Sequence, residues 1–489
     1  MRPKYNDDTF FESEKILIPY RKGDKWGFCD KNKNIVIPCR YDEVQRFKEG
    51  LAKVSVNNKW GLVDESGTEV LPCRYDYIED FNQYEIAMVC FQDKYGLVNK
   101  SGKEILSCKY DEMIFSEDAY YPVSISFIRW GFVDNAGKEI VSCKYNRVKR
   151  FKEGLAVVEI QGKWGCVDIK GNEVIPCKYD ELGDFVDGLS RARINGKYGF
   201  IDKAGEVVVP FVYDGCSSFQ HGFAKVKRND RYGLIDKTGK EVVPCQYAWV
   251  ENFTEKRALV KVENKYGFVD ETGREVILSE YDDADCFYQG LARVCREGRY
   301  GFIDETGKEV IPCKYEDTGI FHDGVIRIKF KGKCGLADKN GKEIIACQYD
   351  DIDVFEEEWA IIRLKYKYGF VDKSGKEIVA CQYDGAMSFS QGLAWVMRSN
   401  KWGFVDHIGN EIIPCKYDDA RPFREDRAGV LFDKKWGFVD KSGREIIPCK
   451  YDELEDFHRG LAKVDFGGNS GYIDKNGTEY WEAIKISDQ

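Results

Sequence analysis

The stretch KWGFVD occupies residues 401–406 and returns unchanged at residues 435–440. Close copies are KWGFCD at 25–30, KWGCVD at 163–168 and KYGFID at 197–202. The aromatic–Gly pair, or a substitute for it, recurs every 34 residues, with two intervals of 35 residues near the start. A fixed period in this range indicates a tandem repeat, which has to be recognised before domains are counted.

The aromatic slot occurs in fourteen units. Cys334 fills it once, and Ser470 fills it in the last unit. The aromatic members are Trp26, Trp60, Tyr95, Trp130, Trp164, Tyr198, Tyr232, Tyr266, Tyr300, Tyr368, Trp402 and Trp436. We therefore expect a single array over residues 1–489, with an N-terminal half-unit at 1–25, repeats at 26–469 and a C-terminal half-unit or cap at 470–489.

Each unit contains a turn signal directly after the aromatic strand. The text D-x-x-G, as in Asp440 to Gly443, follows the strand, and Gly holds this place in every unit except at Lys33. Glycine tolerates a positive φ angle, and the Asp carboxylate can accept hydrogen bonds from amides of the turn itself. D-x-x-G therefore predicts a tight hairpin.

Two further strands complete the unit. The run E-I-I-P-C-K-Y is apolar and β-branched, and its proline predicts an edge strand, a bulge or a strand end. After Tyr-Asp and a Phe comes L-A-K-V-x-V, as in Leu51 to Val56, which alternates apolar and polar residues like a half-buried strand. We predict an all-β fold of about three short antiparallel strands per unit, with the K-W-G strand paired on both sides.

These motifs resemble the WG-repeat proteins, also called KWG-repeat proteins, which are mostly bacterial. The matching text is K-W-G-F-V-D-K-x-G-x-E-I-I-P, then Y-D, then F-x-x-G-L-A-x-V, over nearly the whole chain. The unit that ends in EDAYYPVSISFIR, the unit with Cys334 and the last unit depart from it. The resemblance implies a β-rich interaction module and contributes no catalytic residues.

The arrangement of the units has two solutions. Tyr5 and Phe10 or Phe11 match the Tyr and Phe slots, so the chain starts in mid-unit. Terminal halves that pair would close a ring or a propeller-like toroid, but fourteen units far exceed the four to eight blades of ordinary propellers. We favour an open superhelical β-solenoid or ribbon, and keep the closed arrangement as the alternative.

Composition limits the classes of partner and the location. The net charge is −10 and the sequence has no run of clustered Lys and Arg, which argues against nucleic acid as a partner. No stretch has the length and apolarity of a signal peptide or a membrane span, so we expect no membrane association. Eighteen Cys residues without a secretion signal indicate free thiols and a cytoplasmic location.

The recurrent aromatic and Cys columns favour structure over chemistry. Trp, Tyr and Cys exchange in the aromatic slot, which suits packing between units better than ligand stacking. A single Cys per unit in eleven units, with no C-x-x-C, argues against a metal site and favours small buried thiols. The column comprises Cys39, Cys73, Cys108, Cys143, Cys177, Cys245, Cys313, Cys347, Cys381, Cys415 and Cys449.

The remaining polar residues show no catalytic set. Two Asp columns, beginning at Asp30 and Asp42, suit turn capping rather than calcium binding. Four His residues and no nucleophile or phosphate motif leave no catalytic, cofactor, metal or assigned ligand residue to name. We therefore expect no enzyme and no cofactor.

The expected function is a non-enzymatic scaffold for a protein or peptide partner, with oligomeric state unassigned. The alternatives are carbohydrate or cell-wall binding through repeated aromatics, and self-assembly as a structural protein. Any recognition code should lie where the units differ, as at Lys53, Ser55, Arg193 and Trp395.

Overall fold

The computed structural model describes residues 17–116, 118–356 and 358–482. These residues form strands, turns and loops, with no helix in the ranges described. The chain divides into two compact units, the first comprising Met1–Lys109 with Tyr383–Gln489 and the second Tyr110–Gln382. The half-unit markers Tyr5, Phe10 and Phe11 lie outside the described residues.

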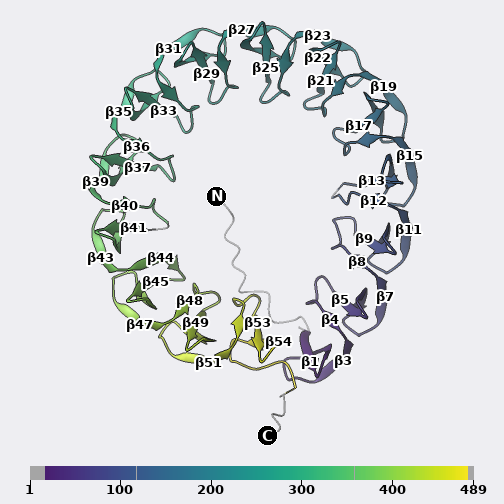
Figure 1. Ribbon diagram of the computed structural model, residues 1–489, viewed down its shortest axis with the longest axis vertical. Coiled ribbons are helices and arrows are strands. Elements are labelled where there is room, and N and C mark those ends of the chain that lie inside the picture. The colour runs from purple at the N-terminus through teal and green to yellow at the C-terminus, as the bar shows by residue number, and fades with distance from the viewer. Residues whose placement is uncertain (1–16, 117, 357, 483–489) are drawn as a thin grey trace. The chain divides into compact units, whose positions relative to one another are not determined.

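Fourteen small antiparallel sheets follow one another along the chain, and we number them blades 1 to 14 (Figure 1). Blades 2 to 13 each have four strands in chain order, and blades 1 and 14 each have three described strands. The all-β repeat fold and the pairing of the K-W-G strand on both sides are thereby confirmed. The expected number of strands per unit is wrong, because most units have a further strand after Tyr-Asp. Outside blade 12 this strand has two residues, too few to produce an alternating sequence pattern.

The first two strand positions of the blades have the following bounds. The first strands are β4 (Glu43–Val44), β8 (Tyr77–Ile78), β12 (Glu112–Met113), β16 (Arg147–Val148), β20 (Glu181–Leu182), β24 (Gly215–Cys216), β28 (Trp249–Val250), β32 (Asp283–Ala284), β36 (Asp317–Thr318), β40 (Asp351–Ile352), β44 (Gly385–Ser390), β48 (Asp419–Ala420) and β52 (Glu453–Leu454). The second strands are β1 (Ile18–Lys22), β5 (Leu51–Val56), β9 (Ile86–Phe91), β13 (Tyr120–Ile125), β17 (Leu155–Ile160), β21 (Leu189–Ile194), β25 (Phe223–Arg228), β29 (Arg257–Val262), β33 (Leu291–Arg296), β37 (Val325–Phe330), β41 (Trp359–Leu364), β45 (Leu393–Arg398), β49 (Ala428–Phe432) and β53 (Leu461–Phe466).

The third and fourth positions complete each blade. The third strands are β2 (Lys25–Cys29), β6 (Lys59–Asp64), β10 (Lys94–Asn99), β14 (Arg129–Asp134), β18 (Lys163–Asp168), β22 (Lys197–Asp202), β26 (Arg231–Asp236), β30 (Lys265–Asp270), β34 (Arg299–Asp304), β38 (Lys333–Asp338), β42 (Lys367–Asp372), β46 (Lys401–Asp406), β50 (Lys435–Val439) and β54 (Asn469–Asp474). The fourth strands are β3 (Ile35–Tyr41), β7 (Glu69–Tyr75), β11 (Glu104–Tyr110), β15 (Glu139–Tyr145), β19 (Glu173–Tyr179), β23 (Val207–Tyr213), β27 (Glu241–Tyr247), β31 (Glu275–Tyr281), β35 (Glu309–Tyr315), β39 (Glu343–Tyr349), β43 (Glu377–Tyr383), β47 (Glu411–Tyr417) and β51 (Glu445–Tyr451).

The D-x-x-G turn forms as the sequence predicts. In blade 2 the Oδ1 atom of Asp64 accepts hydrogen bonds from the amides of Ser66 and Thr68, both at 2.9 Å. Gly67 adopts a φ of 83°, and its amide donates to the Asp64 carbonyl at 2.9 Å. The first Asp column therefore caps turns, as expected.

The glycine after the aromatic permits a close approach between the third and fourth strands. A Cβ atom on Gly61 would lie 2.5 Å from the Leu71 carbonyl oxygen and 2.7 Å from the Cys73 amide nitrogen. The register shifts at this point, so the fourth strand bulges toward the glycine. Pro72 lies exposed on the same outermost strand, where no further strand needs its missing N–H.

The core is divided among the junctions between successive blades. Leu62, Leu71 and Tyr75 of blade 2 form one buried cluster with Ile78 and Val89 of blade 3. Within each unit, successive blades therefore bury one face of a sheet against the next blade, as repeat proteins do with nearest neighbours. Within the unit Tyr110–Gln382, the fourth strands lie along the outer side of an arc and the second strands along its inner side (Figure 1).

Blade 14 packs on blade 1 within the unit that contains both. Buried Tyr480 and Leu461 share a cluster with Ile18 and Cys29. The Arg21 amide donates to the Tyr480 carbonyl at 3.3 Å, so the segment after the last turn pairs in parallel with β1. The blades therefore match the propeller-like alternative better than the open solenoid that the sequence favours. No single repeat shows how the first and last units meet, which explains why the sequence left this choice open.

Candidate functional site

In blades 2 to 14, four positions share one face of the sheet. In blade 2, Glu43 lies opposite Ser55, and Ser55 lies opposite Trp60. Lys53 lies on the same face and opposite Leu62, because side chains two residues apart on a strand point the same way. We call these positions, and their equivalents in other blades, the inner slots.

The slots that vary between units in the sequence converge on this face. Arg193 lies opposite the aromatic Tyr198 in blade 6, as Ser55 does opposite Trp60 in blade 2. Trp395 of blade 12 lies opposite Phe404, in the position that corresponds to Lys53. The four residues singled out in the sequence therefore occupy equivalent places beside the aromatic column.

The aromatic column itself is half-buried. Every described Trp or Tyr in this slot is half-buried except Trp436, which is buried, and the column is thus partly packing. Cations cover several of the rings: the Arg293 guanidinium lies 3.8 Å from the centre of the Tyr300 ring, and the Lys261 ammonium lies 4.6 Å from that of Tyr266. Such cation–π contacts fix the long cationic side chains along the open edge of the aromatic column.

An ion pair holds the hairpin beside each aromatic. The Lys197 ammonium lies 2.5 Å from Oδ1 of Asp214, and Oδ2 of Asp214 accepts a hydrogen bond from the Asn229 amide at 2.8 Å. The Lys197 contact, aided by that amide, lowers the pKa of Asp214 below its ordinary value. Equivalent pairs are Lys25–Asp42, Lys59–Asp76, Lys163–Asp180, Lys265–Asp282, Lys333–Asp350, Lys401–Asp418 and Lys435–Asp452.

We call this arrangement, in which one Asp carboxylate accepts from a turn amide and pairs with the Lys before the aromatic, the clasp. It confirms turn capping by the second Asp column and adds an ion pair that was not predicted from the sequence. The sequence does contain evidence for this ion pair, because the Lys at the start of K-W-G stands 17 residues before an Asp in most units. A constant separation between opposite charges indicates a contact that every unit repeats.

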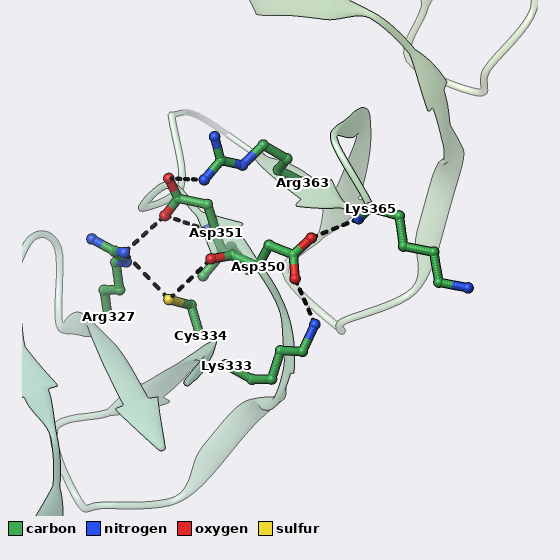
Figure 2. A network of polar contacts seen from close by, with 8 residues as sticks. Arg327, Lys333, Cys334, Asp350, Asp351, Arg363 and Lys365 are labelled. Atoms are coloured by element: carbon green, nitrogen blue, oxygen red, sulfur yellow. Dashed lines mark hydrogen bonds and ion pairs between the residues drawn. The ribbon is translucent and has the colours of Figure 1, made fainter. Parts of the chain in front are cut away.

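The blade with Cys334 replaces the aromatic by a polar network (Figure 2). The Arg327 guanidinium lies 3.2 Å from the Cys334 sulfur and 2.8 Å from the Asp351 carboxylate. Asp351 also faces Arg363 at 3.6 Å, while the adjacent Asp350 keeps the usual clasp to Lys333 at 2.5 Å. The Arg327 guanidinium therefore contacts the Cys334 sulfur, whereas cations in blades 8 and 9 contact the aromatic ring of this slot.

The inner slots of unit Tyr110–Gln382 are rich in cations over six successive blades, blades 6 to 11. Of the two second-strand slots in each of these blades, nine of twelve hold Arg or Lys, although the whole chain carries a net charge of −10. They are Arg191, Arg193, Lys225, Lys227, Lys261, Arg293, Arg327, Lys329 and Arg363. We call these nine residues the basic row.

Carboxylates on the first strands neutralise part of the basic row. Arg193 pairs with Glu181 of the same blade at 2.8 Å. Arg293 reaches Asp317 of the next blade at 3.4 Å. In the described part of the chain, six of the nine cations have a carboxylate partner, and Arg191, Lys261 and Lys329 have none, so the net positive charge of the row is concentrated at these three.

The other unit presents a different chemistry in the same slots. In blade 12, Trp395 and Met397 stand beside Trp402, and Leu431 of blade 13 stands opposite Trp436. Trp395, Met397, Trp402 and Leu431 are half-buried. The same blade backbone therefore carries a row of charged side chains in one unit and a group of apolar side chains in the other.

The thiol column is less buried than the sequence predicts. The Cys108 and Cys177 thiols are half-buried on outer strands, and each Sγ donates to a carbonyl oxygen on the second strand of its own blade, at 3.9 Å. Burial, with a nearby glutamate adding to it, raises the pKa of each of these thiols to about 11. All eighteen cysteines are free, and the described residues contain no group of three metal-ligating side chains.

A cavity lies beside the packing of blade 14 on blade 1. It has a volume of about 320 Å³ and is lined by Arg21, Asp24, Phe466, Trp481 and Glu482 among others. The Arg21 guanidinium donates to the Ser470 carbonyl at 3.3 Å, so its charge is already used in joining the two blades. Helices able to span a membrane are absent from the part of the chain that the structure describes.

Comparison with protein families decides the family of the chain. The model described as "WG containing repeat" matches thirteen times in tandem. The matched residues are 26–60, 60–95, 95–125, 130–164, 164–198, 198–232, 232–266, 266–300, 300–334, 335–368, 368–402, 402–436 and 436–469. The chain belongs to the WG-repeat family. Its resemblance to that family is confirmed, and its blades are WG repeats joined at the K-W-G strand.

No curated protein sequence matches this WG-repeat chain. Among solved structures, the extracellular domain of a hybrid two-component system from B. thetaiotaomicron is 8% identical over 94% of this chain and 75% of that chain, with a TM-score of 0.21. PorZ, a surface component of the type-IX secretion system of Porphyromonas gingivalis, is 9% identical over 95% and 81%, with a TM-score of 0.23. BamB from Moraxella catarrhalis is 9% identical over 59% and 94%, with a TM-score of 0.25. Likenesses this low carry no argument about function.

Proposed function

We propose that this WG-repeat chain is a scaffold that binds protein or peptide partners through its inner slots. The observation that carries the proposal is the contrast between a constant frame and variable slots on one face. The Tyr that ends each fourth strand is the same residue and is buried throughout, whereas the inner slots hold residues as different as buried Ser55 and half-buried Arg193 and Trp395. A fixed backbone that displays different side chains at equivalent places is how repeat proteins build extended binding surfaces.

The test is affinity capture with the full chain as bait. We expect reproducible retention of a protein partner, and direct binding once that partner is purified. A variant with Arg193→Glu and Trp395→Ser should lose most of this binding, because truncation or charge reversal in a contact surface usually removes the dominant contacts. Lys170→Glu, in an exposed turn away from the inner slots, is the matched control. Equal binding by all three proteins, or no partner, would contradict the proposal.

Carbohydrate binding is the second candidate, and the partial exposure of the aromatic column favours it. Half-buried Trp26, Trp60 and Trp402 each leave part of the ring open, as sugar-stacking platforms require. This function predicts quenching of tryptophan fluorescence by a soluble polysaccharide, with no retention of protein. For location we propose a reducing compartment such as the cytoplasm, since the chain carries eighteen free thiols.

A further inference from the structure

The junction of blades 7 and 8, within unit Tyr110–Gln382, departs from the repeat in adjacent slots. The text QYAWVEN replaces Tyr-Asp-Glu, so Ala248 stands in the Asp slot and Trp249 stands in the first inner slot. Arg231 stands in the Lys slot of blade 7, directly before the aromatic Tyr232. These changes lie together in space, because Trp249 and Tyr232 are in ring contact.

Ala248 removes the clasp that restrains the cation in the neighbouring blades. Lys197 and Lys265, which flank this site along the chain, each have an Asp oxygen at 2.5 Å. Ala248 keeps the backbone part of the motif, since its amide donates to the Lys261 carbonyl at 2.9 Å, but it offers no carboxylate. Arg231 is exposed and has no carboxylate partner among the residues that the structure describes.

Trp249 forms a fixed and partly open aromatic platform. Its indole Nε1 donates a hydrogen bond to the Glu251 carboxylate at 2.7 Å. Its ring packs against Tyr232 with a 5.0 Å separation of ring centres, and the Lys225 ammonium lies 4.0 Å from the indole centre. The side chain nevertheless remains 37% exposed. A tryptophan held by its polar edge can stack on a ligand with little loss of conformational entropy.

The charges around this platform leave an excess of cations. Lys225 and Lys227 have carboxylate partners, Glu251 at 3.3 Å and Asp230 at 2.8 Å. Lys261 lies directly opposite Trp249 and donates to the Tyr266 hydroxyl at 3.1 Å, with no carboxylate partner in the described part of the chain. Two cations without acidic partners among the described residues therefore belong to this site: Arg231 directly precedes Tyr232 in the sequence, and Lys261 lies opposite Trp249.

We infer that the site formed by Arg231, Tyr232, Trp249 and Lys261 binds an acidic peptide segment in which a carboxylate stands next to an aromatic or apolar side chain. The Arg231 guanidinium supplies a bidentate contact to the carboxylate, and Lys261 adds positive charge. Trp249 with Tyr232 receives the neighbouring apolar side chain. This inference rests on the proposed scaffold function and assigns one site and one class of ligand to it.

The experiment selects short random peptides from a display library against the full chain at physiological ionic strength. Selected peptides should be enriched in Asp or Glu next to an aromatic or apolar residue. Fluorescence anisotropy with a labelled synthetic copy then measures affinity. Arg231→Ala and Trp249→Ala should each weaken binding at least about tenfold. Arg299→Ala, in the same slot of blade 9 but paired with Glu316 at 3.6 Å, and Tyr366→Ala, 88% exposed at a hairpin tip, should leave it unchanged.

Ala248→Asp separates loss of the site from loss of the fold. This variant restores the clasp, so it should hold Arg231 and cap the 263–264 turn, leaving thermal stability equal to or above wild type while weakening peptide binding about tenfold. Peptides without acidic enrichment, wild-type affinity in Ala248→Asp, or binding of an acidic polysaccharide such as polygalacturonate in place of peptides would each overturn the inference. A captured protein partner that binds all these variants equally would refute this site and leave the scaffold function standing. Absence of both partner and peptide would refute both.

Discussion

The Tyr315 hydroxyl donates a 3.0 Å hydrogen bond to the carboxylate of Glu343. Tyr315 ends the fourth strand of blade 9, and Glu343 begins the fourth strand of blade 10, so the bond joins successive blades. The same bond links Tyr75 to Glu104 at 3.0 Å and Tyr451 to Glu479 at 3.0 Å. The column of buried tyrosines therefore ties neighbouring blades together in addition to filling the core.

We expect Tyr315→Phe to lower the free energy of unfolding by about 1 kcal/mol, the usual net worth of one such hydrogen bond. Chemical denaturation of the full chain would measure this. Tyr179→Phe is the matched control, because Val207 stands where its glutamate partner would be. Equal losses in the two variants would show that the hydroxyl contributes nothing through the glutamate.

Stability should fall at alkaline pH. Burial, with a neighbouring charged or thiol group adding to it, raises the pKa of Tyr213 and of Tyr417 to about 12. Tyrosines of the unfolded chain ionise near pH 10, before those of the folded chain. Stability from this source is therefore complete below about pH 10 and is lost as the pH rises toward about 12. Denaturation midpoints across this range, with phenolate absorbance as a parallel readout, would check it, and a constant midpoint would contradict it.

Replacing the glycine of the K-W-G strand by any larger residue should destabilise the fold. A Cβ atom on Gly233 would overlap the Val243 carbonyl oxygen and lie 2.8 Å from the Cys245 amide nitrogen. We expect Gly233→Ala to cost about 2 kcal/mol, because the bulge must open. Gly215 of the same blade would place its Cβ 3.7 Å from the nearest atom, an ordinary contact. Gly215→Ala should then be nearly neutral by thermal denaturation, and equal effects would argue against the close approach.

The contact of blade 14 with blade 1 should depend on Tyr480. This side chain is 2% exposed, and its backbone pairs with both Tyr472 and Arg21. Tyr480→Ala should cost about 3 kcal/mol locally, by analogy with other large buried aromatics. Hydrogen exchange should accelerate in Ile18–Lys22 and Asn469–Asp474. Unchanged exchange in these two strands would show that the terminal blades are stable without each other.

The outer-strand thiols should react slowly in the folded protein. Burial, with help from a nearby glutamate, raises the pKa of Cys108 and of Cys449 to about 11, so about a thousandth of each is thiolate at pH 8. Ellman's reagent should therefore modify these thiols far more slowly before than after denaturation. If the thiols of the native protein reacted with Ellman's reagent as fast as those of the denatured protein, the burial of this Cys column would be contradicted.

Much of the repeat could be predicted from local sequence. D-x-x-G turns, the edge strand with its proline and the paired K-W-G strand all involve residues within one hairpin, where spacing alone reports contact. The two-residue first strands, the Lys–Asp clasp and the Tyr–Glu bond were missed. The Lys–Asp and Tyr–Glu pairs could have been found from the sequence, because their two residues are separated by a nearly constant number of positions from unit to unit. The loss of the clasp at Ala248 is also visible there, because Ala replaces the Asp that follows Tyr in most units.

The sequence by itself determined the period, the all-β class and the identity of the turns, because each depends on interactions within about one repeat. Tertiary structure alone decided that Trp481 reaches Arg21 across most of the chain. No single repeat encodes a contact between residues that lie this far apart in the sequence, because each repeat specifies only its own strands and its nearest neighbours. Tertiary structure also decided that Arg231 has no carboxylate partner among the described residues, since this depends on which side chains the neighbouring blade brings beside it.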